Sequence, residues 1–306
     1  MGPRTPCAII STENVDFHMM SIAFMGVGGA DYYLSIARED YFLKGGEPPG
    51  IWWGDGAKTL KLSGQVRPHD FHALFRAITP GGEALVQNAG KEDRQLGCEL
   101  TFLAPKTVSA LWSQGDETLR RETQAAHSEA VRAALAYLQE EIPLTRRGRV
   151  RSKPELAGLV VALFEHATNR DLAPALHTHA LLTNVCTRQD GSTGSILSKP
   201  VYRHKTVVGA LYRVELAAQL ECRLGVRCCL AEGASAFAIE GSGESMERVF
   251  SRGRAAIEEG FKSSGLEGTA TAAIAAFPRG KGEIRFFRKV GVSHQPRSWN
   301  LASWRP

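Results

Sequence analysis

The sequence lacks several features that would assign a protein to a familiar class at once. Its 306 residues contain no uncharged apolar run of about 18, the length that a membrane-spanning helix needs, so no membrane insertion is expected. The six cysteines form no C-x-x-C pair, which argues against a thiolate zinc site or a disulfide framework and favours a reducing, cytoplasmic location. There is no G-x-x-x-x-G-K-S/T loop either, so nucleotide hydrolysis of that type is not expected.

The composition is that of a folded protein with a mildly basic surface. Hydrophobic residues make up 43% of the chain and charged residues 23%, a balance that permits a sizeable core and excludes a mostly disordered chain. The formal net charge is +5 at pH 7. This basic excess is compatible with a polyanionic partner but does not require one.

Hydrophobic patterning divides the chain into a folded centre and two irregular ends. Residues 1–18 have the pattern of an irregular arm. The pattern weakens after Phe277, and residues 288–306 show no period. We therefore expect one domain over residues 19–287, with a disordered extension before it and a disordered tail after it.

Periodicity in the centre predicts a mixture of strands and helices. Dense apolar strands are expected at 158–165 and 176–185, and an alternating strand at 99–102. A long helix with a polar face is expected over 116–141, and another helix over 204–224. Together these elements predict an α+β fold.

Shorter elements are expected before the first of these strands. Trp52, Trp53 and the stretch 60–66 suggest a short hairpin. Pro68 begins an amphipathic pattern that predicts a helix to about Ile78, since proline is favoured in the first turn of a helix.

The most informative residues are three histidines, His166, His177 and His179. Residues two apart in a strand point to one face, so His177 and His179 project together. A neighbouring strand ending at His166 would bring a third imidazole to the same point. Three imidazoles on one face would form a metal site with open positions, suited to catalysis. The alternative is that histidines two apart lie on a solvated strand face.

The histidine motifs resemble those of conjugative relaxases of the MobF class, which are HUH-type single-strand endonucleases. Residues 163–170 and 174–180 carry this likeness, and residues 99–109 resemble the family motif D-L-T-F-S-A-P-K-S-V-S. Residues 31–33 and 40–42 resemble the two N-terminal tyrosine motifs of the family. The order of tyrosine, acidic and histidine motifs is also the relaxase order.

The resemblance, which covers about residues 19–277, implies both a fold and a function. The fold would be a central, mainly antiparallel sheet that bears the histidine triad, with helices packed on the other face. The function would be site- and strand-specific nicking and rejoining of single-stranded DNA at a transfer origin. Relaxosome accessory proteins and coupling proteins would be further partners of a monomeric chain.

The resemblance also implies roles for the site residues. Tyr32 would attack the scissile phosphate, form a covalent 5′-phosphotyrosine and release a 3′-OH. Tyr41 would serve a second strand transfer, although nine residues on one unbroken helix would place it opposite Tyr32. Glu99 stands where the family has aspartate and would orient a ligand imidazole and take the tyrosine proton. The alternatives are helix packing for the tyrosines and a solvated surface charge for Glu99.

A divalent metal ion is the implied cofactor. It would withdraw charge from a non-bridging phosphate oxygen. The family is usually assigned Mg or Mn, whereas imidazole ligands by their softness suit Zn, Ni or Co.

Three basic residues are candidate DNA contacts. Arg213 lies in a Leu-Tyr-Arg match to the family, Arg170 follows the first histidine motif, and Lys106 follows Glu99. Each could bind a phosphate or form a local ion pair. The basic run at 146–153 looks like a hairpin and could either contact DNA or be merely solvated.

Three functions therefore remain open from the sequence. The first is an active relaxase. The second is a degenerate relaxase that binds single-stranded DNA without efficient cleavage, because Glu99 replaces aspartate and the tail diverges. The third is a metal-dependent hydrolase that acts on a small substrate.

Overall fold

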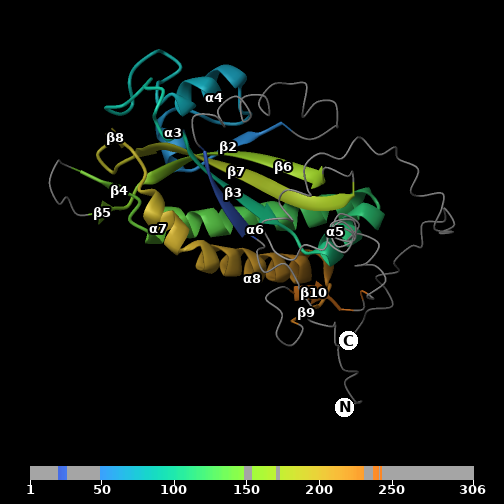
Figure 1. The fold of residues 1–306 in the computed structure, drawn as a ribbon. Helices are drawn as coiled ribbons and strands as arrows, with labels where there is room; N and C mark the ends of the chain where they lie inside the picture. The colour runs from blue at the N-terminus through green and yellow to red at the C-terminus, as the bar shows by residue number, and fades with distance from the viewer. Residues whose placement is uncertain are drawn as a thin grey trace, which may run out of the picture.

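A six-stranded antiparallel sheet forms the centre of the molecule in a computed structural model of the chain (Figure 1). The structure describes residues 20–25, 49–147, 154–169, 173–230, 237–240 and 242. The strands are ordered β1-β3-β7-β6-β2, with β8 paired to β7. Their bounds are β1 (Met20–Met25), β2 (Ile51–Trp53), β3 (Gly97–Leu103), β6 (Gly158–Thr168), β7 (Pro174–Thr187) and β8 (Thr193–Gly194). The expectations for the two chain ends lie outside the described residues.

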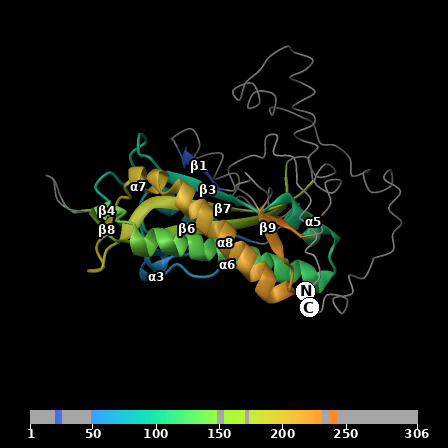
Figure 2. The same cartoon turned by 90° about the horizontal axis from the view of Figure 1, so that it is seen from below.

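Three helices cover one face of this sheet. They are α5 (Lys106–Gln114), α6 (Glu117–Glu141) and α8 (Lys205–Leu224). The long helices α6 and α8 pack against each other along the sheet (Figure 2). Alternate residues of β6, such as Leu159 and Val161, join Leu135 of α6 and Leu216 of α8 in one core. The predicted helical layer is confirmed.

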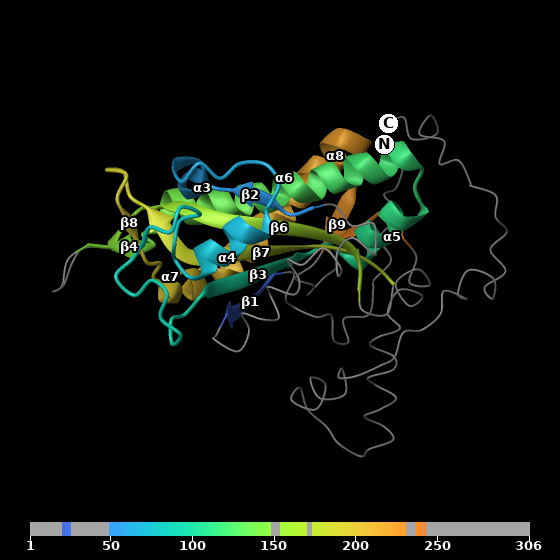
Figure 3. The ribbon, with the colours of Figure 1, turned by 90° about the horizontal axis from the view of Figure 1, so that it is seen from above.

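Two short helices cover part of the opposite face (Figure 3). They are α3 (Asp55–Thr59) and α4 (Pro68–Phe75). Phe71 of α4 packs edge-on against Phe164 of β6, with ring centroids 5.9 Å apart. The sequence predicted helices on one face only. The strands β6 and β7 are nevertheless apolar in continuous runs, and such runs need cover on both faces.

Capping residues explain where the main helices begin and end. The Asp116 carboxylate accepts a hydrogen bond of 2.8 Å from the Leu119 N–H, which satisfies a donor in the first turn of α6. Pro68 occupies the first turn of α4. The helix α8 ends at Gly225, whose φ of +64° is the left-handed conformation that glycine adopts without strain.

The remaining elements are small. A helix α7 (Ser198–Arg203) precedes α8. One two-stranded sheet joins β4 (Thr145–Arg146) to β5 (Pro154–Glu155), and another joins β9 (Cys228–Leu230) to β10 (Phe237–Ile239). Among the described helices, none combines the length and apolar character that a membrane crossing requires.

The hairpin predicted from Trp52, Trp53 and residues 60–66 is present in a short form. Trp52 and Trp53 belong to β2, which pairs with β6 at the edge of the main sheet. The later segment pairs with β2 through an antiparallel bridge between Ile51 and Gln65. The Trp52 N–H also donates to the Gly64 carbonyl at 2.9 Å, and the Val66 N–H donates to the Gly50 carbonyl at 2.7 Å. The helix α3 lies between the two segments in the sequence, and the pairing of β2 with β6 is the part that the sequence did not predict.

Gly97 fixes the start of β3 against β7. Its φ is +154°, and a Cβ at this position would lie 2.1 Å from the backbone oxygen of Leu182. We therefore expect Gly97→Ala to destabilise the fold by about 2–3 kcal/mol. Chemical denaturation measures this loss. Gly81→Ala is the control, because the nearest atom to its added Cβ would be 3.6 Å away, and equal stability of the two variants would contradict the prediction.

Candidate metal centre

The three histidines come together at one end of the sheet. His166 lies near the end of β6, and His177 and His179 lie near the start of β7. His166 is the direct cross-strand partner of His177, and Phe164 is the partner of His179. Opposed residues of an antiparallel pair have their side chains on one face. All three imidazoles therefore share the face that α6 and α8 leave open.

The three rings surround one point. One ligand nitrogen from each histidine lies within 4.8 Å of the others. The ring centroids are 5.1 Å apart for His166 and His177, 5.0 Å for His166 and His179, and 4.9 Å for His177 and His179. The ring planes are inclined by 61–86°, so the rings meet edge to face rather than stack. This arrangement suits three ligands converging on one ion.

Hydrogen bonds orient two of the imidazoles. The Nδ1 atom of His177 donates to the Ala175 carbonyl at 2.7 Å. The Nδ1 atom of His179 donates to the Glu99 carboxylate. Both acceptors are oxygens without a proton to give, so the ring proton of each histidine lies on Nδ1. The Nε2 lone pair of each ring is thereby available to a metal.

Burial keeps two of the rings in the form that binds metal. Desolvation, together with the neighbouring His179 and His177, lowers the pKa of His166 to about 3. Desolvation also lowers the pKa of His177. Both rings are therefore neutral at pH 7, and one nitrogen of each ring carries a lone pair, so a metal does not have to displace a proton from that nitrogen.

Two side chains of β3 complete the site on its other side. Glu99 and Thr101 alternate with buried core residues, and Thr101 is the cross-strand partner of His179. Thr101 Oγ1 donates to Glu99 Oε1 at 3.2 Å. The longer glutamate side chain thus reaches the imidazole directly, with Thr101 helping to hold it. The sequence reasoning missed Thr101, although its place two residues after Glu99 puts it on the same strand face.

Comparisons with known proteins agree with this geometry. A family model described as TrwC relaxase matches residues 27–282. The chain belongs to the TrwC relaxase family. It is similar to the multifunctional conjugation protein TraI of Escherichia coli K12, with 34% identity over 219 residues, and to a second Escherichia coli TraI with 31% identity. These matches cover 66% of this chain but only 12% of each TraI protein.

Solved structures of TrwC match this relaxase-family chain over most of its length. A metal-free complex of TrwC with oriT DNA has a TM-score of 0.72 and 26% identity, covering 87% of this chain and 92% of that one. A metal-bound complex has a TM-score of 0.72 and 25% identity, covering 87% of this chain and 93% of that one. A copper-bound complex has a TM-score of 0.71 and 26% identity, covering 86% of this chain and 93% of that one. The family and the α+β fold predicted from the motifs are both confirmed.

Of the other predicted site residues in this relaxase-family chain, the structure describes Lys106 and Arg213. Lys106 is the exposed first residue of α5 and follows β3 at the end of the sheet that bears the imidazoles. Arg213 lies half-buried on α8, against the opposite face, and burial lowers its pKa. Tyr32, Tyr41 and Arg170 lie outside the described residues.

The basic run at 146–153 begins at the end of β4 and leads to its paired strand β5, as the expected hairpin would, although residues 148–153 lie outside the described residues. Arg147 bonds Asp190 at 2.6 Å and lies 3.5 Å from Glu155. Glu155 also forms an ion pair with Arg188 at 2.9 Å. Carboxylates therefore already neutralise Arg147, which favours a structural role for this residue over a phosphate contact.

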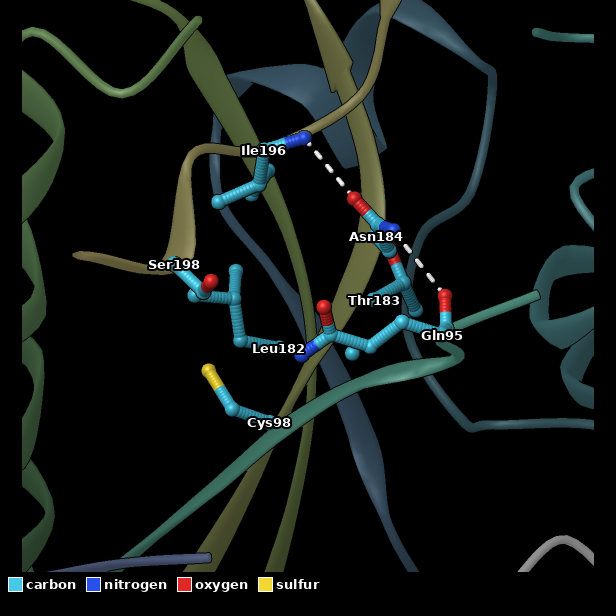
Figure 4. A pocket seen from close by; sticks show the side chains of 8 residues that line it. Gln95, Cys98, Leu182, Thr183, Asn184, Ile196 and Ser198 are labelled. Atoms are coloured by element: carbon cyan, nitrogen blue, oxygen red, sulfur yellow. Dashed lines mark hydrogen bonds between the residues drawn. The ribbon is translucent and has the colours of Figure 1, made fainter. Parts of the chain in front are cut away.

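A small pocket lies at the other end of β3, towards α7 (Figure 4). The Asn184 side chain spans it, accepting a hydrogen bond from the Ile196 N–H and donating one to the Gln95 carbonyl, both at 2.9 Å. None of its lining residues is charged: Gln95, Gly97, Cys98, Leu182, Thr183, Asn184, Ile196 and Ser198. The two hydrogen bonds of Asn184 connect β7 to the segments that contain Gln95 and Ile196. The pocket offers no acid or base for catalysis.

Proposed function

We propose that this chain is a relaxase domain, spanning residues 19–287, that nicks and rejoins single-stranded DNA at a transfer origin. The observation that carries the proposal is the convergence of three imidazoles on one sheet face, with Glu99 bonded to His179. The matched TrwC structures, which are described as complexes with oriT DNA, support the substrate.

The three histidines fit a divalent metal ion. The Nδ1 atoms of His177 and His179 are hydrogen-bonded. One ligand nitrogen from each of the three histidines converges on the same point. When bound, the ion would withdraw charge from a non-bridging oxygen of the scissile phosphate. Mg or Mn would be the working ion by family resemblance, and Zn, Ni or Co would also suit imidazole. The copper-bound TrwC structure supports a site that accepts soft divalent ions.

The protein groups perform the bond exchange in this proposal. The phenol oxygen of Tyr32 bonds to phosphorus as the bond from phosphorus to the 3′ oxygen breaks. The phenol proton passes to the Glu99 carboxylate, and the departing 3′ oxygen takes up a proton to become the 3′-OH. Because the phosphotyrosine keeps a phosphate ester, the 3′-OH can later attack it and rejoin the strand. Tyr41 would accept a second strand, and Arg170, Arg213 and Lys106 would bind phosphates.

The second candidate is a DNA-binding module that cleaves poorly because Glu99 replaces aspartate. The contact between Glu99 and His179 favours the active enzyme, since the carboxylate reaches the ligand it would orient. We propose the cytoplasm as the location, and relaxosome accessory and coupling proteins as further partners of a monomer.

Incubation of the chain with labelled single-stranded DNA tests this function. The DNA would be a pool of oligonucleotides that covers the region beside its own gene, with Mn²⁺ present. We expect a covalent protein–DNA adduct on a denaturing gel, absent when a chelator is added. Binding without an adduct would favour the module, and neither binding nor adduct would contradict both.

Glu99 gives a further prediction. Removing its carboxylate leaves the His179 Nδ1–H without its acceptor, so Glu99→Ala should weaken metal affinity by about 10–100-fold. Glu99→Asp restores the residue typical of the family and should retain nicking. Calorimetric titration with Mn²⁺ and the gel assay measure the two effects. Equal metal affinity in Glu99→Ala and the wild type would reduce Glu99 to a surface charge.

A further inference from the structure

Polar side chains lie directly behind the candidate metal centre. Glu165 of β6 and Thr178 of β7 are cross-strand partners. Glu165 precedes His166, and Thr178 separates His177 from His179. Successive strand residues alternate between faces, so this pair points away from the imidazoles and towards α6.

Side chains on one face of α6 contact both Glu165 and Thr178. Gln124, His127 and Ser128 are spaced i, i+3 and i+4, which places them side by side on the helix. Ser128 Oγ donates to Glu165 Oε2 at 2.7 Å, and Gln124 Nε2 donates to Glu165 Oε1 at 3.1 Å. His127 Nε2 lies 2.8 Å from Thr178 Oγ1, within hydrogen-bond distance.

His127 also connects α6 to α8. Its Nδ1 atom lies 2.8 Å from the hydroxyl of Tyr212, so both ring nitrogens have a partner. His127 and Tyr212 are completely buried, and Thr178 is 4% exposed. The hydrogen-bonded chain therefore runs from α8 through α6 to the strand residue between two imidazoles.

The core does not need polar groups at this place. From Ala130 to Leu138 the buried face of α6 is alanine, valine and leucine. Apolar residues would pack equally well behind the imidazoles without the cost of desolvating an imidazole, a carboxylate and three hydroxyls. A hydrogen-bonded network that is buried or partly buried instead fixes one geometry, because a displaced member would lose its partner where water cannot readily replace it.

We propose that this network positions the metal-binding imidazoles. We define the α6 network as Gln124, His127, Ser128, Glu165, Thr178 and Tyr212. It holds the backbone of β6 and β7 at residues adjacent to the three histidines, and so fixes the direction in which each imidazole leaves its strand. Its members are positioning residues that touch neither metal nor DNA. The inference rests on the proposed function, since it takes the triad to bind metal.

Thr178→Val is the decisive variant. Valine has nearly the shape of threonine but lacks the hydroxyl, so the contact with His127 Nε2 is lost. We expect Co²⁺ affinity, measured by titration of the whole chain, to fall by about 10-fold. The visible absorption band of bound Co²⁺ should change as well, because it reports ligand geometry. Thr178→Ser returns the hydroxyl and should restore both.

Thr183→Val is the matched control. Thr183 is on the same strand, is completely buried and donates to the Val160 carbonyl at 3.0 Å, but lies away from the imidazoles. It should lower the melting temperature and leave Co²⁺ affinity and spectrum unchanged. If Thr183→Val weakens Co²⁺ binding as much as Thr178→Val, or if Thr178→Val binds like the wild type, the proposal is wrong.

Ser128→Ala keeps the test decisive if Thr178→Val does not fold. Alanine is the best helix former, so this change removes the bond to Glu165 without weakening α6. We expect a several-fold loss of Co²⁺ affinity, and an unchanged affinity would contradict the proposal. A wild-type chain that binds no Co²⁺ would instead overturn the metal site itself, so the two failures are distinguishable.

Discussion

Replacing His177 with alanine should abolish metal-dependent cleavage while leaving the fold intact. His177 supplies one of three converging nitrogens, and among the described residues the cluster has only His166 and His179 besides it. We expect metal affinity to fall by more than about 100-fold, beyond the effect of losing an orienting partner. An open site contributes less to folding than a closed structural site, so the melting temperature should change little.

Calorimetric titration with Mn²⁺ and the adduct assay check this result together. His69→Ala is the control, because the His69 side chain is 74% exposed on α4. That variant should bind metal and form adduct like the wild type. Wild-type metal affinity in His177→Ala would defeat the metal assignment even if the variant were inactive.

Replacing Tyr32 with phenylalanine should eliminate the covalent adduct with little change in DNA affinity. The substitution keeps the aromatic ring but removes the oxygen that would attack phosphorus. Tyr32 is the first choice because its Asp-Tyr-Tyr motif is the nearer match to the family. A denaturing gel measures the adduct, and fluorescence anisotropy with single-stranded DNA measures affinity.

Tyr41→Phe is the matched control for the nucleophile. Its motif also resembles the family, yet it is expected to act only in a second strand transfer, so this variant should still form the adduct. Mass spectrometry of the trapped peptide locates the linkage. A phosphodiester found on Tyr41 alone would reverse the two assignments.

The main elements were predictable because their patterns are long. The apolar runs at 158–165 and 176–185 became β6 and β7, and the amphipathic pattern at 116–141 became α6. The pairing of β2 with β6 was not predictable in this way. Short strands carry too few residues to show every neighbour they pair with, and β6 lies about a hundred residues later in the sequence.

The metal-binding face was predictable from spacing, since two histidines two apart in a strand must share a face. The α6 network behind this face was not predictable from the sequence. His127 and Ser128 look like ordinary polar residues of a polar-faced helix until tertiary packing turns that face towards Thr178. Only the sheet register shows that Glu165 and Thr178 oppose each other, because register depends on the whole hairpin.

The placement of all three histidines in one hairpin bears on the order of folding. His166 and His177 are joined by a short connection, whereas Glu99 lies 80 residues from His179 in sequence. Hairpins close in about 1–10 μs, and contacts between distant segments form later because their loop-closure entropy is larger. The imidazole cluster can therefore assemble while β3 is still unpaired. In a folding chain the three imidazoles can bind metal first, and the Glu99 carboxylate reaches His179 only when β3 pairs with β7.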